Sequence, residues 1–446
     1  MSENVKVISF LGIGNYSPTC YVWKGREVQT EFFTEAVAHF IKPSKMMICL
    51  TPTASKGDKS ANWQKLSRRL ESAHIHFEPL PIPEGHAESD LWDIFNALTN
   101  AVDEGENLVF DITHSFRSLP FLSFLAIAYL KAAKNVKVQN VLYGAWEARD
   151  TSTNRSPVFD LTPFVSLLDW LTATEQFIQT GNARQLVQLI SSDQHEKDRQ
   201  IKAVARVLDK VSQAAFLCQP FTLMKVVQEL SPTLQEAEEG ISKTVPPFYQ
   251  LRQQIVDEFE LFRADFPNDP QRVLQSEYQL VRWYIEKNQL IQAMSLAREF
   301  LVDGVQYKFT QSLSPDSFAR GLRGDFERAV SGQPKIGGQN QEGSGRFTVD
   351  DLNEYGKKIY NNENDKWKER DLIKQAWAEL ESVRNGMDHA EHQKSPIPIQ
   401  TLQKKIKKDI LPALEKLAEV WGLSEIPQAS NLEPFPYEEN GNQSGE

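Results

Sequence analysis

Apolar residues in the first part of the chain fall into short, nearly continuous runs separated by stretches with helical periodicity. Runs of this kind, in contrast to strict alternation, are typical of strands in a parallel sheet that is covered on both faces. Helices between such strands predict a doubly wound, Rossmann-like α/β fold for residues 1 to about 160. The expected strands are 5–11, 46–50, 108–112 and 136–143, with 76–82 as a further candidate.

Strand signals give way to helical periodicity between residues 163 and 424, which predicts an all-α second half. The expected helices are 163–190, 196–215, 249–262, 272–301, 316–329 and 350–360. Two later apolar stripes repeat at three and four residues, as expected for one face of a helix. The first comprises Leu372, Ile373, Ala376, Trp377, Leu380 and Val383; the second comprises Leu402, Ile406, Ile410, Leu414, Leu417 and Trp421, and Gly422 is expected to end it.

These patterns predict several domains, because a chain of 446 residues is long for one. We expect an α/β domain (1–162), a helical linker region (163–270), a helical domain (271–424) and a disordered tail (425–446). A Gly-rich stretch at 331–346 predicts a flexible insertion between helices.

Charge and cysteine content narrow the class of protein. The net charge is −11, whereas a protein that coats nucleic acid is usually basic, so contact with nucleic acid is expected only at a local site. The three cysteines are far apart and form no CxxC, which argues against a zinc ribbon or a disulfide scaffold. The longest apolar run, 121–130, is too short to cross a bilayer, and no signal peptide is evident, so we expect a cytoplasmic, soluble protein without a membrane partner.

Polar and glycine residues follow the expected strands, where ligands bind in open α/β sheets. The first strand leads into Gly12-Ile13-Gly14-Asn15, and the second leads into a hydroxyl-rich loop with Thr51 and Thr53. The fourth strand ends at Gly144, which would allow a close backbone approach. The first loop lacks the third glycine of a dinucleotide fingerprint, and no Walker A sequence is present. A tight turn remains the alternative explanation for the first loop.

The loop after the third strand, Asp111-Ile-Thr113-His114-Ser115-Phe-Arg117-Ser118-Leu-Pro120, carries the densest set of polar side chains. Ser118 is the expected cap of the following helix, and Pro120 suits the first turn of that helix. A helix N-terminus favours a phosphate, and Arg117 adds a forked donor. Together the loops predict a pocket for a polyphosphate or an oligonucleotide, and the alternative is a capped turn with a solvated arginine.

Near the end of the helical half, Arg384-Asn385-Gly386-Met-Asp-His389 suggests a site for cutting RNA. We expect Asn385-Gly386 to stop the helix, so that Arg384 and His389 converge. His389 would move the proton of a ribose 2′-hydroxyl or of the leaving oxygen, while Arg384 holds the phosphate and Asn385 orients it. A surface arginine and histidine at a helix end is the alternative.

Two other features of this region bear on its chemistry. His389 and His392 lie three residues apart beside two acidic residues, but no second ligand cluster accompanies them, so no metal site is predicted. A basic strip on the next helix either faces solvent or guides RNA; it consists of Lys404, Lys405, Lys407 and Lys408.

In these motifs the chain resembles the CRISPR-associated CARF–HEPN ribonucleases, the accessory nucleases of type III systems. Residues 111–120 are similar to the second sensor motif of that family, and residues 12–16 to the loop after its first strand. Residues 384–389 match the HEPN pattern of arginine, a polar residue and then histidine. Family members often have glycine where this chain has Ser115, a departure that would change pocket shape or ligand choice.

The resemblance implies an α/β sensor domain joined to an all-α HEPN domain. It implies an antiviral endoribonuclease that is activated by a cyclic oligoadenylate, needs no metal or other cofactor, and cuts single-stranded RNA to leave a 2′,3′-cyclic phosphate. Two chains would form a homodimer or a higher homo-oligomer, with the activator on the two-fold axis and one composite nuclease site. The implied catalytic residues are Arg384, Asn385 and His389; the implied ligand-binding residues are Gly12, Gly14, Asn15, Thr51, Thr53, Thr113, His114, Ser115, Arg117 and Gly144.

A different class of function remains open. The chain would then be a non-enzymatic nucleotide-sensing regulator whose helical half binds DNA or a protein partner. The acidic charge and the lack of a basic recognition helix weigh against it. Some relatives also degrade their activator in the sensor site, for which Thr51, Thr53, His114 and Arg117 would be the candidates.

Overall fold

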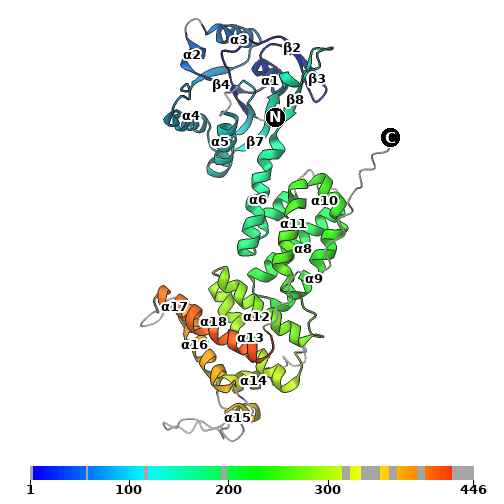
Figure 1. Ribbon diagram of the computed structural model, residues 1–446, viewed down its shortest axis with the longest axis vertical. Coiled ribbons are helices and arrows are strands. Elements are labelled where there is room, and N and C mark those ends of the chain that lie inside the picture. The colour runs from blue at the N-terminus through cyan, green and yellow to red at the C-terminus, as the bar shows by residue number, and fades with distance from the viewer. Residues whose placement is uncertain are drawn as a thin grey trace, which may run out of the picture. The chain divides into compact units, whose positions relative to one another are not determined.

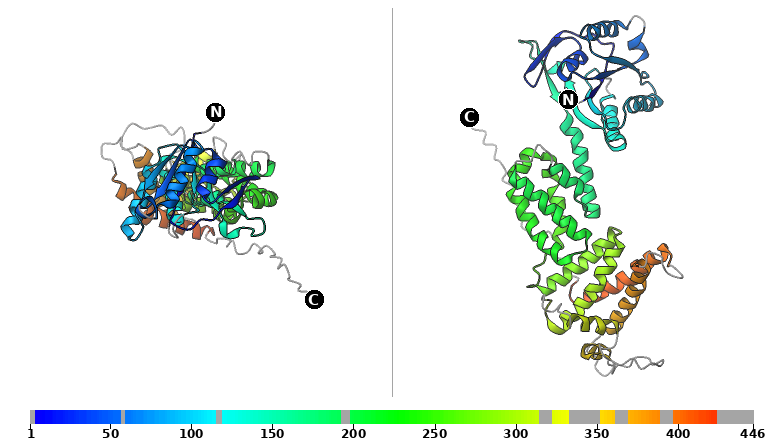
Figure 2. Two further views of the ribbon diagram at one scale, coloured as in Figure 1. Left: turned by 90° about the horizontal axis from the view of Figure 1, so that it is seen from above. Right: turned by 180° about the vertical axis from the view of Figure 1, so that it is seen from behind.

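The computed structural model describes most of the chain, and its residues group into two compact units, Met1–Asp169 and Trp170–Glu446 (Figures 1 and 2). The residues described are 4–56, 59–114, 119–191, 198–313, 322–332, 352–360, 369–388 and 397–423. Within these ranges, no helix combines the length and the apolar character that a membrane span requires.

The first unit is built on an eight-stranded sheet with the order β3-β2-β8-β7-β6-β1-β4-β5. All five expected strands are present and are mutually parallel neighbours in the sheet. They are β1 (Val5–Phe10), β4 (Lys45–Leu50), β5 (Phe77–Pro81), β6 (Asn107–Asp111) and β7 (Lys137–Gly144). The doubly wound core of the prediction is therefore confirmed.

Three further strands were not predicted: β2 (Thr19–Trp23), β3 (Arg26–Thr30) and β8 (Arg155–Asp160). The sheet is mixed, because β2 pairs antiparallel with β3, and β7 pairs antiparallel with β8. Two of these strands lack continuous apolar runs: the exposed, polar β3 lies at the edge, and β8 contains Pro157; β2 is largely apolar, but only alternate residues are buried. A pattern search tuned to buried parallel strands misses such segments.

Helices cover both faces of this sheet, which explains why β1 carries apolar residues on both of its faces. Val5 and Val7 face a core shared with α1 (Phe33–Ile41) and α3 (Ala61–Ser72). Ile8 and Phe10 face the opposite core, shared with α4 (Glu88–Asn100) and α5 (Leu119–Lys134). A short helix, α2 (Pro52–Ser55), follows β4.

The described part of the second unit contains helices and no strand, as predicted. One apolar core runs through these helices. They are the end of α6 (Thr162–Thr180), α7 (Arg184–Ile190), α8 (Arg199–Phe216), α9 (Pro220–Glu236), α10 (Glu238–Thr244), α11 (Pro246–Glu260), α12 (Pro270–Glu286), α13 (Leu290–Thr310), α14 (Leu322–Ser331), α15 (Glu354–Tyr360), α16 (Arg370–Asp388), α17 (Ile399–Lys405) and α18 (Leu411–Val420), with a π-helical turn, η5 (Ile406–Ile410), between the last two.

Two of the expected helices each divide into a pair. The expected helix 163–190 breaks after α6, where Gly181 has a φ of 73°, and 272–301 breaks after α12, where Asn288 has a φ of 57°. Both residues take the left-handed conformation that ends a helix. The helices α9 and α10 were not predicted; α9 begins at Pro220 and retains Pro232 in its interior, so proline there does not mark a loop.

The last helical stripe is present, but it is not one regular helix. The π-helical turn η5 separates α17 from α18, while Ile406, Ile410 and Leu414 remain fully buried. The predicted stop is confirmed: α18 ends at Val420, and Gly422 has a φ of 71°. The Gly-rich insertion, apart from residues 331–332, and the predicted tail lie outside the described residues.

Trp421 closes the helical core over Gly304 in the middle of α13, since a Cβ on Gly304 would overlap the Trp421 ring. We therefore expect Gly304→Ala to lower the free energy of unfolding of the helical unit by about 1–3 kcal/mol, the usual cost of overpacking. Gly324→Ala in α14 is the matched control. A Cβ at residue 324 would meet only the far end of the Arg328 side chain. The variant should therefore leave the free energy of unfolding unchanged, or raise it by up to about 1 kcal/mol because alanine favours a helix more than glycine does. Urea unfolding of both variants measures the difference, and equal effects would contradict this packing role.

Candidate functional site

The buried carboxyl group of Asp111 organises the loops at the carboxyl edge of the sheet. Asp111 ends β6 and is fully buried. Its Oδ2 accepts hydrogen bonds from Ser9 Oγ at 2.6 Å and Thr34 Oγ1 at 3.4 Å, and its Oδ1 accepts one from the Thr113 backbone N–H at 2.9 Å. Burial raises the pKa of Asp111 in spite of these donors. The carboxyl group thus joins β1, α1 and the loop after β6.

His114 follows in the same loop and is held as a neutral imidazole. Its Nε2 accepts a hydrogen bond from the Phe33 backbone N–H at 3.2 Å, and its ring lies 4.3 Å from the Tyr16 ring, centroid to centroid. Burial lowers the pKa of His114 to about 4. An imidazole whose Nε2 accepts carries its proton on Nδ1, so it offers a neutral N–H donor.

The loop after β1 packs against this histidine. The Gly12 N–H donates to the Tyr16 hydroxyl at 3.1 Å, and a Cβ on Gly12 would lie 3.5 Å from the His114 carbonyl oxygen. Asn62, from α3, donates its side-chain amide to the carbonyl oxygens of Gly12 and Gly14 at 3.1 and 2.9 Å. Gly14 and Asn15 are exposed. Sequence reasoning missed Asn62, because this residue lies within a helix and follows no strand.

Gly144, at the end of β7, is required by packing as well as by its place at the sheet edge. Its N–H donates to Thr113 Oγ1 at 2.9 Å, and a Cβ there would overlap the Phe33 ring. The loops after β1, β6 and β7 therefore meet around Tyr16 and Phe33, which the sequence alone did not identify.

The loop after β4 forms a second polar group at this edge. Thr51 Oγ1 caps α2 by accepting from the Ala54 N–H at 3.3 Å, and the Thr53 N–H donates to Glu84 Oε1 at 2.7 Å. Burial opposes ionisation of Glu84, but hydrogen bonds from Thr53 and Thr51 outweigh it and lower the pKa of Glu84. Glu84 lies just beyond β5, where the same strand-end rule would have found it. A carboxylate here suits a hydroxyl or amino donor of a ligand.

Two of the expected ligand-binding residues, Ser115 and Arg117, lie outside the described residues, as does the expected cap Ser118. Pro120 lies in the first turn of α5, as predicted. The structure thus brings Gly12, Thr113, His114 and Gly144 together, and it places Thr51 and Thr53 at the same sheet edge.

In the helical unit, Arg384 and Asn385 are consecutive residues of α16; Arg384 is half-buried and Asn385 is exposed. The prediction that Asn385-Gly386 stops the helix is wrong, because α16 continues to Asp388. Gly386 instead allows close packing. A Cβ there would lie 3.2 Å from Ile397 and 3.4 Å from Leu402, so the glycine lets α17 and the segment just before it approach α16 closely. His389 lies outside the described residues, so its convergence with Arg384 stays a prediction.

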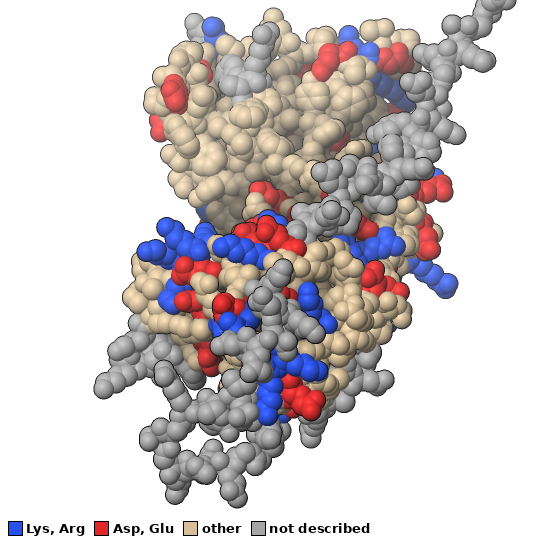
Figure 3. Space-filling view, turned by 60° about the horizontal axis from the view of Figure 1, so that its bottom comes forward, with Lys and Arg blue, Asp and Glu red and all other residues tan. Residues whose placement is uncertain are grey.

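The possible metal site and the basic strip of this region can be placed only in part. His389 and His392 both lie outside the described residues, and within those that are described, no three His, Cys, Asp or Glu side chains form a possible metal site. Lys405 pairs with Glu379 at 2.6 Å, while Lys404, Lys407 and Lys408 are exposed. On the face drawn in Figure 3, cations are interspersed with carboxylates and form no broad basic field.

Comparison with known proteins adds two matches to family models. Residues 6–147 match the CARF domain of the CRISPR system endoribonuclease Csx1, and residues 166–262 match the second domain of the CRISPR-associated protein MJ1674. The MJ1674 protein of Methanocaldococcus jannaschii is 26% identical over 188 residues, which is 42% of this chain but only 28% of that protein. The aligned part is thus less than a third of that relative's length.

A solved structure, Enterococcus italicus Csm6 bound to cyclic hexa-2′-fluoro-hexa-dAMP, aligns over 95% of both chains. The sequence identity is 10% and the TM-score is 0.42, which is too low to establish a common fold.

The neutral state of His114 makes stability depend on pH. Because the folded-state pKa is about 4 and the ordinary value is 6.5, the unfolded chain binds more protons between these values. The free energy of unfolding should therefore fall as the pH drops from 6.5 toward 4. His114→Gln retains an acceptor for the Phe33 N–H and should remove this part of the slope. Urea unfolding at several pH values tests the point, and parallel curves for the two proteins would contradict it.

Proposed function

We propose, from the premise that this chain belongs to the CRISPR-associated CARF–HEPN family, that it is an endoribonuclease switched on by a cyclic oligoadenylate. The α/β unit would bind the activator, and the helical unit would cut single-stranded RNA. The observation that carries the proposal is the convergence of three strand-end loops around Asp111 and His114, within residues 6–147 that match the CARF domain of an endoribonuclease.

The chemistry of the strand-end loops suits an oligonucleotide activator. Exposed backbone at Gly14 and Asn15 allows a phosphate to come close. The Nδ1–H of His114 is a neutral donor for a phosphate or base oxygen, and Glu84 is an acceptor for a 2′-hydroxyl or an adenine amino group. Arg117, beside the N-terminal end of α5, would supply the charge that balances a phosphate.

The proposed cleavage needs no group beyond those of the chain and the RNA. His389 takes the proton of the 2′-hydroxyl, and the 2′-oxygen attacks the adjacent phosphorus. The bond from phosphorus to the 5′-oxygen breaks as a protonated acid, here the second chain's His389, supplies that oxygen with a proton. Arg384 stabilises the charge on the phosphoryl oxygens, and Asn385 orients them. The products are a 2′,3′-cyclic phosphate and a 5′-hydroxyl.

A homodimer is supported by apolar stripes on two neighbouring helices. Phe121, Leu125 and Tyr129 repeat at four-residue spacing on α5, and all three are exposed, Phe121 by 68%. On α6, Phe164 is 65% exposed, and Leu167, one turn on, is exposed as well. The Lys131–Asp169 ion pair, at 2.5 Å, links the two helices. Exposed apolar side chains in this arrangement are typical of an interface, and a two-fold pair of chains matches a symmetric ring ligand.

The first test is RNA cleavage by purified protein in EDTA, with and without cyclic tetra-adenylate or hexa-adenylate. Cleavage should require one of the two ligands. Arg384→Ala and His389→Ala should each lower the activated rate by about 100-fold or more, the usual cost of losing one such group, while activator affinity stays the same. Arg117→Ala should do the reverse, so that more activator is needed for the same maximal rate.

The exposed basic strip provides a matched control for the loss of a cation in the helical unit. Lys404→Ala also removes one positive charge, but from an exposed position, and should change cleavage far less than Arg384→Ala. Full cleavage by His389→Ala would overturn the assigned catalytic site. Tight activator binding with no RNA cleavage by the unaltered protein would favour the non-enzymatic regulator instead.

The dimer has a separate test. A carboxylate in the centre of an apolar interface is costly, so Phe121→Glu should convert the dimer to a monomer and abolish activated cleavage. Light scattering after size exclusion measures the mass. Phe216→Glu, at a 72% exposed phenylalanine of the helical unit, is the matched control and should leave the dimer intact. A Phe121→Glu protein that remains dimeric would contradict this interface.

A further inference from the structure

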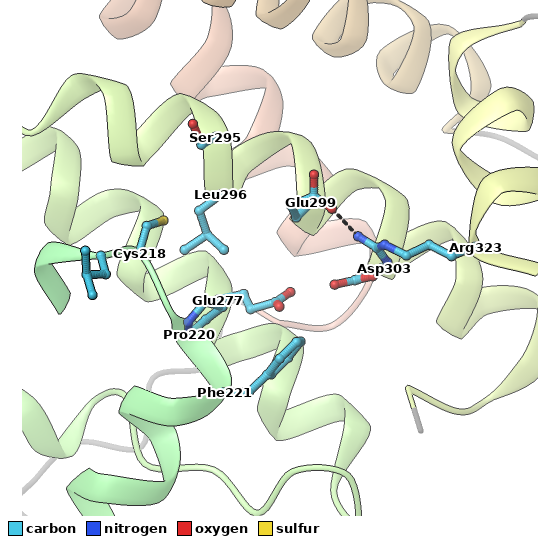
Figure 4. A pocket seen from close by; sticks show the side chains of 10 residues that line it. Cys218, Pro220, Phe221, Glu277, Ser295, Leu296, Glu299, Asp303 and Arg323 are labelled. Atoms are coloured by element: carbon cyan, nitrogen blue, oxygen red, sulfur yellow. Dashed lines mark hydrogen bonds and ion pairs between the residues drawn. The ribbon is translucent and has the colours of Figure 1, made fainter. Parts of the chain in front are cut away.

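A cavity of about 580 Å³ lies within the helical unit, apart from both candidate sites (Figure 4). It is formed by the turn between α8 and α9 together with α12, α13 and α14. The volume falls in the range of small-molecule sites in proteins, about 300–1,000 Å³. Carboxyl groups occupy one end of the cavity, and apolar side chains form much of the remaining wall.

Two of the three carboxyl groups in the cavity form ion pairs with arginine. Arg323, from α14, forms ion pairs with Glu299 and Asp303, which are one turn apart on α13. Glu299 also pairs with Arg298. Burial opposes ionisation of Glu299, but the two arginines outweigh it and lower its pKa.

Glu277, from α12, has no such partner. Its side chain is fully buried, and among the described residues its carboxyl oxygens meet no N–H donor; their one hydrogen-bonding neighbour is the Asp303 carboxyl group. In Figure 4 the Glu277 carboxyl group points into the space bordered by Asp303 and Phe221. Burial, reinforced by the neighbouring Asp303 carboxylate, raises the pKa of Glu277 well above its usual range. A single proton between two buried carboxyl groups leaves their other lone pairs without donors, which a ligand with several N–H groups would supply.

We propose that this cavity is a binding site for a small organic cation, an aliphatic amine or guanidine, whose positive group pairs with Glu277 and Asp303. Arg298 and Arg323 serve Glu299 and Asp303, so Glu277 is the carboxyl group in the cavity that a further positive group would pair with. Leu217, Pro220, Phe221 and Leu296 supply an apolar wall for the methylene chain of such a ligand.

An organic cation fits this cavity better than a metal ion does. Cations such as Ca²⁺ and Mg²⁺ need several oxygen ligands converging at short distance. The described residues hold no group of three acidic, histidine or cysteine side chains with suitable spacing, because Glu299 and Asp303 are already turned toward Arg323. An ammonium or guanidinium group needs only two or three acceptors, and an apolar wall favours its hydrocarbon part.

Binding of the cation is linked to release of a proton. In the empty cavity Glu277 and Asp303 share a proton, because burial also raises the pKa of Asp303 to about 6 despite Arg323. When the ammonium group enters, that proton leaves to solvent and the carboxylate pairs with the ligand. The groups that face this pair are Glu299, Arg323 and Cys218; the pKa of Glu299 is lowered and that of Cys218 is raised to about 11, so neither changes its charge between pH 7 and 5. Affinity should therefore fall as the pH decreases from 7 to 5.

The test is isothermal titration of the full chain with putrescine, spermidine and agmatine in about 150 mM salt with excess Mg²⁺, which screens the acidic surface. We expect at least one of the three to bind, with proton release that appears as a difference in heat between phosphate and Tris buffers. Butane-1,4-diol, the uncharged counterpart of putrescine, should not bind. Putrescine and agmatine distinguish an ammonium from a guanidinium preference.

Glu277→Gln should weaken binding of the preferred cation at least about tenfold, because the charge is lost while the shape is kept. It should not lower stability, since the new amide can donate to Asp303, and thermal unfolding without ligand confirms that the variant is folded. Glu286→Gln changes an exposed carboxylate at the end of the same helix and should leave the affinity unchanged. Ser295→Met narrows the cavity from α13 and provides a second variant, which should also weaken binding.

Two results would overturn the proposal. One is that none of the three cations binds in the presence of Mg²⁺. The other is that Glu277→Gln binds the cation as tightly as the unaltered protein, which would place the cation on the acidic surface. Neither result bears on the proposed nuclease, because the cavity contains none of its assigned residues.

Discussion

The α/β unit of this protein depends on one buried carboxyl group. Asp111 sits at the end of the central strand β6 and accepts hydrogen bonds from β1, from α1 and from its own loop. Thr113, which it holds, accepts in turn from Gly144 at the end of β7. Such a group is costly to bury unless its donors are in place, so the three elements and the loops between them are positioned as a set. Whatever binds at this edge meets a site whose spacing is set before the ligand arrives.

Much of this arrangement was predictable because it follows from chain-local rules. Mainly apolar runs identified four of the five parallel strands, with 76–82 as a further candidate, and the strand-end rule led to Gly12, Thr113, His114 and Gly144. Asn62 was not predictable, because it reaches Gly12 from a helix; Glu84 was within reach of the strand-end rule but follows the least apolar of the parallel strands. The strands β3 and β8 were missed because these half-exposed strands carry no continuous apolar run, whereas the short apolar run of β2 was overlooked.

In the helical half, the helices were easier to predict than the positions at which they end. Periodicity located most of its helices, yet single residues in the left-handed conformation, Gly181 and Asn288, divided two of them. Asn385-Gly386 looked like a third such break, but there tertiary packing of Gly386 against α17 keeps the helix intact. Local propensity is a weak prior at such positions, because contacts made elsewhere in the chain decide the outcome. The same reasoning applies to Glu277. The sequence could not show that this residue has no cationic partner among the described residues, because that depends on which side chains of separate helices meet in the fold.

The indole of Trp421 resting on Gly304 has a consequence for how the protein is made. The core between α13 and α16 is completed by a residue at the end of α18, the last described helix, so it cannot close while that helix is still inside the ribosome. Domains generally acquire their structure as units once their final elements emerge. The α/β unit, which lies first in the chain, can therefore fold while the helix that carries Arg384 still lacks its support. During synthesis, the sheet edge around Asp111 is complete before the helical core is.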